Sequence, residues 1–90
     1  MAKPAFKRGL SEEQIRFAFE HPLEGLEGRS RARDFGKIPP RYGLVGVEPY
    51  NAQSVELVYS YLDNGVVIFH ANWLTKRFLK EMKEANKNDR

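Results

Sequence analysis

The sequence predicts an α+β fold: an N-terminal helix, a three- to four-stranded antiparallel sheet with a hairpin, and a C-terminal helix. Two segments, 11–20 and 72–85, repeat apolar residues at helical spacing. Between them, residues 55–62 follow a period of two and are rich in β-branched and aromatic side chains, as strands are. A chain of 90 residues, 41% of them hydrophobic, suffices for one domain spanning 1–90. We expect residues 1–8 and 87–90 to be flexible.

The first helix is expected to begin after Ser11 and to end near Glu20. Ser11 and Gln14 have the spacing of a capping box, in which each side chain accepts from the other residue's backbone amide. Pro22 disfavours helical geometry in the residue before it, which ends the helix. Residues 23–43 contain many glycines and prolines and predict a long loop, part of which, around Ala32–Phe35, is expected to pair as an edge strand.

The sheet is expected to follow this loop. Residues 44–47 predict one strand and residues 55–62 the next. The Asn64-Gly65 pair suits the positive φ angles of a type I′ hairpin turn. Because Val66–His70 is apolar almost throughout, we expect that strand to be central and covered on both faces. Asn72 is expected to cap the last helix. Its buried stripe is predicted to comprise Leu74, Phe78, Met82 and Ala85.

Composition argues against several classes of protein. There is no cysteine, and the two histidines lack the spacing of a zinc site, so neither a disulfide framework nor a metal centre is expected. No cofactor motif is present, and no cofactor is expected. No apolar run is long enough to span a membrane, and the first ten residues lack the apolar core of a signal peptide. We therefore expect a cytoplasmic protein.

Positive charge is concentrated in residues 29–41, and this group supplies the candidate RNA- or phosphate-binding residues. They are Arg29, Arg31, Arg33, Lys37 and Arg41. The three arginines alternate, so an extended segment would point all three the same way, and arginine can hold phosphate oxygens bidentately. Phe35 and Tyr42 interleave the charges with rings that can stack on bases. The alternatives are a solvated surface loop or a surface for an acidic protein.

Two further side chains are candidates for catalysis. His70 lies where the apolar strand meets the last helix, and a neutral imidazole can accept or donate a proton, as phosphodiester cleavage requires. Arg77, on the first turns of that helix, could stabilise negative charge on phosphorus. The alternatives are a half-buried structural histidine and a solvated helix face. With no phosphate-binding glycine loop and no nucleophile motif, these residues suit metal-independent cleavage of RNA by its own 2′-hydroxyl.

Two runs of the sequence resemble small toxin-like domains of the BrnT kind. RGLSEEQIRFAFEHPLE is similar to their opening helix, and GLVGVEPYNAQSVELVYSYLDNGVVIFHANWLTKRFL to their strands and basic last helix. The resemblance implies the RelE/ParE-like toxin fold, with an N-terminal strand near Ala5–Lys7. It also implies a ribosome-dependent or free ribonuclease, or else a gyrase inhibitor, neutralised by a small antitoxin. By position, His70 and Ala71 match the end of the last strand of those domains and Arg77 matches a basic position on their helix. Asn72 and Thr75 stand where BrnT-like chains and their relatives often carry arginine.

We therefore expect a toxin-like endoribonuclease, or mRNA interferase, of a type II toxin–antitoxin pair. His70 would act as acid and base and Arg77 would stabilise the transition state. The expected partners are RNA, including ribosome-bound mRNA, and a small antitoxin protein, and no membrane. The departures at Asn72 and Thr75 leave open a non-catalytic module of the same fold that binds nucleic acid or protein, and an interaction protein whose basic surface docks an acidic antitoxin segment.

Overall fold

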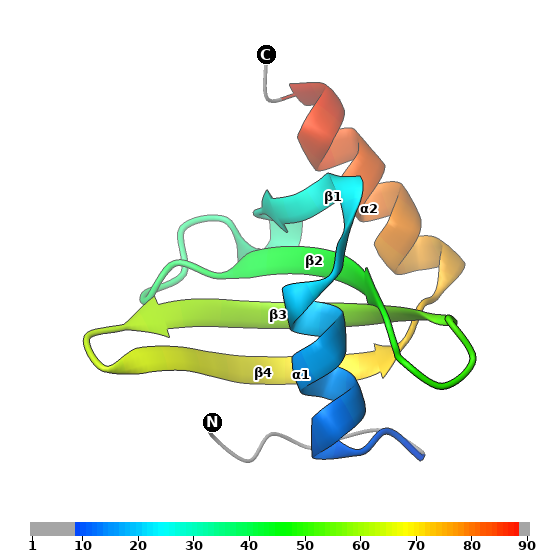
Figure 1. Ribbon diagram of the computed structural model, residues 1–90. Helices are drawn as coiled ribbons and strands as arrows, with labels where there is room; N and C mark the ends of the chain where they lie inside the picture. The colour runs from blue at the N-terminus through cyan, green and yellow to red at the C-terminus, as the bar shows by residue number, and fades with distance from the viewer. Residues whose placement is uncertain (1–8, 89–90) are drawn as a thin grey trace.

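The computed structural model describes residues 9–88 and contains two helices and a four-stranded sheet (Figure 1). The elements are α1 (Glu12–Glu20), β1 (Pro22–Arg29), a 3-10 helix (Ala32–Asp34), β2 (Tyr42–Val47), β3 (Ser54–Leu62), β4 (Gly65–Trp73) and α2 (Lys76–Asn88). The strands pair antiparallel in the order β1-β2-β3-β4. The predicted α+β arrangement is confirmed. Within the described residues, no helix is long and apolar enough to cross a membrane.

The two helices pack on opposite faces of the sheet, α1 in front and α2 behind in Figure 1. Ile15 and Ala18 of α1 pack in one apolar cluster with the side chains that one face of the strands presents. Phe78 and Met82 of α2 form a second cluster on the opposite face. Because neighbouring strand residues point to opposite faces, β2 and β3 each contribute to both clusters.

Gly46 of β2 allows α1 to lie directly against the sheet. A Cβ atom at this position would stand 2.0 Å from the carbonyl oxygen of Ala18 and 2.7 Å from its carbonyl carbon. Both are backbone atoms that no rotamer change can move, so any side chain here would displace the helix.

The first helix begins and ends as predicted. The backbone amide of Gln14 donates to Ser11 Oγ at 3.1 Å, and the amide of Ser11 donates to Gln14 Oε1 at 2.8 Å, so the capping box is confirmed. The helix ends at Glu20, before Pro22. Gln14 also donates from Nε2 to the buried carboxylate of Glu48 at 3.2 Å, which ties α1 to the turn between β2 and β3.

Three expectations about the strands were wrong. Pro22–Arg29 is a strand within the expected loop, and residues 32–34 form a 3-10 helix in place of the expected edge strand at Ala32–Phe35. β1 resembles a loop in sequence because Gly25 and Gly28 take positive φ angles of 79° and 69° where its pairing with β2 is irregular. β4 is an edge strand, not a central one. Within its apolar run only Ile68 is buried, whereas Val66, Val67 and Phe69 are partly exposed, so the run indicates neither a central position nor full cover on both faces.

The structure also differs from the predictions in the type of the hairpin turn and in the residue that caps α2. The predicted hairpin is present, and Asp63 and Asn64 connect Leu62 to Gly65. A type I′ turn needs a positive φ angle at Asn64, whereas the positive φ angle of this turn, 148°, belongs to Gly65. Asn72 lies inside β4 and does not cap α2. Thr75 takes that role, since its Oγ1 accepts from the amide of Phe78 at 3.2 Å.

Some expectations fall on parts of the chain that the structure does not describe. The strand expected near Ala5–Lys7, and the flexibility expected at residues 1–8 and 89–90, lie outside the described residues. Residues 87 and 88 continue α2.

Candidate functional site

A hollow of about 340 Å³ lies on the α2 face of the sheet, and most of the predicted site residues gather there. We call it the basic cleft. The strands contribute Val58, Phe69 and His70 to its lining, and the segment 31–41 contributes Arg31, Arg33, Asp34, Lys37 and Arg41. His70 and four of the five predicted basic residues therefore lie together, although they come from regions far apart in the sequence.

A bulge in β4 brings His70 into the basic cleft. Val58 of β3 pairs with His70, and the next residue, Tyr59, pairs with Ile68, so Phe69 is an extra residue in β4. In a regular strand two successive side chains point to opposite faces, whereas a bulge turns both toward one face. Both Phe69 and His70 line the basic cleft as a result.

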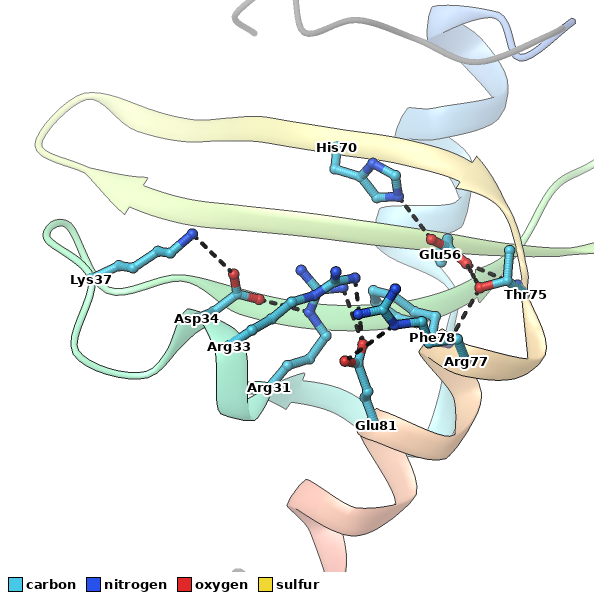
Figure 2. Close-up of polar contacts among 10 residues, drawn as sticks. All are labelled: Arg31, Arg33, Asp34, Lys37, Glu56, His70, Thr75, Arg77, Phe78 and Glu81. Atoms are coloured by element: carbon cyan, nitrogen blue, oxygen red, sulfur yellow. Dashed lines mark hydrogen bonds and ion pairs between the residues drawn. The ribbon is translucent and has the colours of Figure 1, made fainter.

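His70 is held by a buried glutamate from the neighbouring strand. Its Nε2 lies 2.7 Å from Oε2 of Glu56, whose side chain is only 5% exposed. The other carboxylate oxygen, Oε1, accepts from both the backbone amide and the hydroxyl of Thr75, each at 2.8 Å. Figure 2 shows the two sets of contacts meeting at Glu56. Since Thr75 also caps α2, the helix start, the carboxylate and the imidazole form one connected unit.

These contacts keep Glu56 ionised and determine which ring nitrogen of His70 donates to it. Burial alone would raise the pKa of Glu56, but the hydrogen bonds from His70 and Thr75 outweigh it and hold the pKa below its usual value. An ionised carboxylate can only accept, so Nε2 of His70 carries the proton that it donates to Glu56. In the neutral ring Nδ1 is then the proton acceptor. Among residues 9–88 no side chain or backbone group bonds to Nδ1, and the His70 side chain is 34% exposed.

Arg31 is a structural part of the basic cleft. It is 5% exposed, its Nε lies 2.6 Å from Oδ2 of Asp34, and its Nη1 lies 3.5 Å from Oε1 of Glu81 on α2. Its guanidinium also sits 4.8 Å from the centre of the Phe78 ring. Arg31 therefore holds the 31–34 turn against α2, and its charge is largely neutralised by two carboxylates.

The expectation that Arg29, Arg31 and Arg33 share one side of an extended segment was wrong. β1 ends at Arg29 and the 3-10 helix begins at Ala32, so the backbone turns between the arginines. The three side chains consequently have different surroundings: Arg31 is buried, Arg33 is about half exposed, and Arg29 lines a different hollow.

Three cations of the basic cleft are available to a ligand. Arg33 pairs with Glu81 at 3.5 Å and Lys37 with Asp34 at 3.8 Å, and both side chains are nearly half exposed, so these ion pairs are weak and exchangeable. The guanidinium of Arg41 lies over the Phe69 ring, 4.2 Å from its centre. Within the described part of the chain, Arg41 has no carboxylate partner and its buried Nε has no hydrogen-bond acceptor.

Two predicted site residues lie outside the basic cleft. Arg29 lines a second hollow, of about 700 Å³, between the end of β1 and α2. Arg77 is 73% exposed on α2 and lies 3.9 Å from a carboxylate oxygen of Glu81. Neither residue lines the basic cleft, and the roles predicted for them stay predictions.

Sequence reasoning missed Glu56, Thr75 and Asp34. Glu56 had a detectable signal, because it is the one charged residue in a strand rich in apolar and aromatic side chains, and a glutamate is rarely buried without a partner. In the β3–β4 pairing Glu56 lies opposite Asn72, two residues along β4 from His70 and on the same face. Within 9–88, no three histidine or acidic side chains come together as metal ligands.

Comparison of the chain with models of protein families, with curated proteins and with solved structures found no match to any of them.

Proposed function

We propose that the basic cleft binds RNA and cleaves it as a metal-independent endoribonuclease, with His70 as the base. The observation that carries the proposal is the His70–Glu56 pair at the rim of a cleft that Arg33, Lys37 and Arg41 also line. A carboxylate that holds one ring nitrogen presents the other as a proton acceptor. The three cations attract the phosphodiester that carries the scissile bond.

The proposed reaction uses groups that RNA and the protein supply. Nδ1 of His70 takes the proton of a ribose 2′-hydroxyl, and the 2′-oxygen attacks the adjacent phosphorus. The bond from phosphorus to the 5′-oxygen breaks, and the leaving oxygen takes a proton from solvent. The products are a 2′,3′-cyclic phosphate and a 5′-hydroxyl. Arg41 and Lys37 stabilise the extra negative charge that develops on the phosphoryl oxygens.

The biological role that we propose is that of an mRNA interferase in a type II toxin–antitoxin pair, acting in the cytoplasm and neutralised by a small antitoxin. The support for this role is the resemblance of the two sequence runs to BrnT-like toxins. RNA, including ribosome-bound mRNA, would be the substrate.

A second candidate function is binding of RNA without cleavage. The observation that favours it concerns Thr75, whose hydroxyl donates to Glu56 and caps α2. By the resemblance, this position often carries arginine in toxins of the BrnT kind. Arg77, the helix cation that was expected to stabilise the transition state, lies outside the basic cleft. Under this alternative the cleft would hold RNA tightly while the phosphodiester remained intact.

Expression from a tightly repressed promoter tests the proposal against the alternative. We expect the unaltered protein to arrest growth with loss of cellular RNA, and His70→Ala to relieve both. The matched control is His21→Ala, because His21 is the only other histidine and lies at the exposed end of α1. Growth arrest by His70→Ala equal to that of the parent would refute the role of His70. Normal growth with intact RNA, together with tight RNA binding by the purified protein, would support the binding module.

A further inference from the structure

The two most exposed large apolar side chains of residues 9–88 lie beside the basic cleft. Phe35 is 85% exposed and Ile38 is 92% exposed. Both belong to the segment that supplies the cleft cations, so they alternate with charge along the chain: Arg33, Phe35, Lys37, Ile38 and Arg41. Scattered apolar residues on a surface are ordinary, but two in one short turn that borders a binding cleft mark an interaction surface.

The turn that carries these side chains is held firmly on both sides. On one side, Asp34 accepts from Arg31 at 2.6 Å, and the amides of Phe35 and Lys37 donate to the carbonyl oxygens of Ala32 and Asp34. On the other side, the hydroxyl of Ser60 in β3 donates to the carbonyl oxygen of Pro40. The outward position of Phe35 is therefore imposed by the turn and does not result from a lack of local contacts.

Phe35 also stands between the two hollows. It lines the second hollow, of about 700 Å³, together with Arg29, Tyr42 and the α2 residues Glu81 and Glu84, and it precedes Lys37, which lines the basic cleft. The second hollow is within the range of volumes of ligand sites. A chain of repeating anionic and flat aromatic units could thus place a phosphate in the basic cleft and its neighbouring ring against Phe35.

We propose that Phe35 and the second hollow form a nucleotide subsite, in which an unpaired base next to the phosphate held in the basic cleft stacks on the Phe35 ring. This inference rests on the proposed function, since it takes the strand in the cleft to be RNA. The argument for an unpaired base is twofold: the cations on either side of Phe35 match a phosphate backbone, and an exposed aromatic ring offers a face to any base. A paired base would be unavailable for such stacking because both its faces are covered within the duplex.

The experiment measures binding of fluorescent 2′-O-methyl oligonucleotides, which keep bases and phosphates and resist cleavage by the 2′-hydroxyl route. We expect Phe35→Ala to weaken binding of the single strand about tenfold and Phe35→Trp to retain it. The dependence of binding on salt should be unchanged, because no phosphate contact is lost. The control is Tyr50→Ala, which removes a side chain that is 63% exposed in the turn between β2 and β3, at the opposite end of the sheet (Figure 1).

An oligonucleotide with one abasic site isolates the stacking contact. With an abasic site at the stacked position, found by moving the site along the strand, the unaltered protein should bind about tenfold more weakly, and Phe35→Ala should make no further difference. If Phe35→Ala weakened both oligonucleotides equally, or neither, the subsite would be refuted even if RNA cleavage were established. If the base-dependent effect of Phe35 appeared while RNA stayed uncut, the subsite would stand and the proposed cleavage would fail. No binding of either oligonucleotide by the unaltered protein would overturn the subsite.

Discussion

Replacing Glu56 with glutamine keeps the size of a buried side chain and removes its charge, which tests how His70 is held. In the unaltered protein the carboxylate accepts three hydrogen bonds, from His70 Nε2 at 2.7 Å and from the amide and hydroxyl of Thr75 at 2.8 Å each. Glutamine can keep the two bonds from Thr75 through its carbonyl oxygen. Its NH₂ group then faces His70, and His70 must accept in place of donating.

The expected loss of stability follows from these three bonds. Hydrogen bonds to a charged group contribute about 1.5–3 kcal/mol each, against about 0.5–1.5 kcal/mol for neutral ones. Three bonds that each weaken by about 1–1.5 kcal/mol sum to about 3–4.5 kcal/mol. Because burial opposes the charge, the net cost at pH 7, measured by urea denaturation, should be about 2–4 kcal/mol. For a domain of this size, each kcal/mol corresponds to a fall in Tm of about 4–8 °C. Glu56→Ala, which leaves both donors without an acceptor, should cost more than Glu56→Gln.

The contribution of Glu56 to folding stability depends on pH. The pKa of Glu56 is lower in the folded protein than in the unfolded chain, because the hydrogen bonds from His70 and Thr75 outweigh the effect of burial. Its contribution to stability is therefore complete above the unfolded pKa, at about 4.3, and is lost as pH falls through the folded pKa. The difference in stability between the unaltered protein and Glu56→Gln should therefore have its full value above the unfolded pKa and should shrink as pH falls below about 4.

The tautomer of His70 is the decisive readout. Nitrogen-15 NMR of the two histidines, with His21→Ala to assign them, should place the proton of neutral His70 on Nε2 in the unaltered protein and on Nδ1 in Glu56→Gln. Under the proposed function the variant should also lose RNA cleavage, by about 10²-fold or more, because Nδ1 no longer accepts a proton. An unchanged tautomer, or equal stability of the two proteins at pH 7, would refute the reasoning.

Three further substitutions test the roles assigned above. Arg31→Ala should cost about 3 kcal/mol in urea denaturation because the buried carboxylate of Asp34 then keeps only its weak pair with Lys37 at 3.8 Å, whereas Arg33→Ala should cost less than about 1 kcal/mol; equal costs would contradict the structural role of Arg31. Gly46→Ala should lower stability by at least about 1–3 kcal/mol, because α1 must move away from the sheet, and an unchanged Tm would contradict that packing. Arg41→Ala should reduce the slope of log affinity for RNA against log salt by about 1, while Arg16→Ala on the opposite face should leave the slope unchanged.

The elements with strong local signals could be predicted from the sequence. Ser11 and Gln14 mark the start of α1 because a capping box is a contact between residues three apart. The hairpin at Asp63 and Asn64, and the buried positions Phe78 and Met82 of α2, are likewise set by local chemistry and periodicity. The position of β4 could not be predicted in this way. The apolar run of β4 is only partly buried in the structure, and only the pairing of the whole sheet places the strand at an edge.

Most residues of the basic cleft could be predicted from the sequence, but their arrangement in space could not. His70 and the cations were identified from their chemistry and from the distribution of charge. Their geometry depends on the bulge at Phe69, which places two successive side chains on one face, and on the turn after β1, which buries Arg31 and leaves Arg33 half exposed. Neither feature follows from a regular period of two. Glu56 was overlooked because its partner, His70, lies on another strand.

Cleavage of a DNA oligonucleotide that contains a single ribonucleotide tests the proposed chemistry most directly. In the presence of EDTA, we predict that the purified protein cuts only after the ribonucleotide and leaves a 2′,3′-cyclic phosphate and a 5′-hydroxyl. His70→Ala should lower the rate by about 10²–10⁴-fold, and His21→Ala should leave it unchanged. An uncut substrate, cleavage of the all-deoxy control, or cleavage by His70→Ala at the parental rate would contradict the proposal that His70 activates a 2′-hydroxyl in the basic cleft.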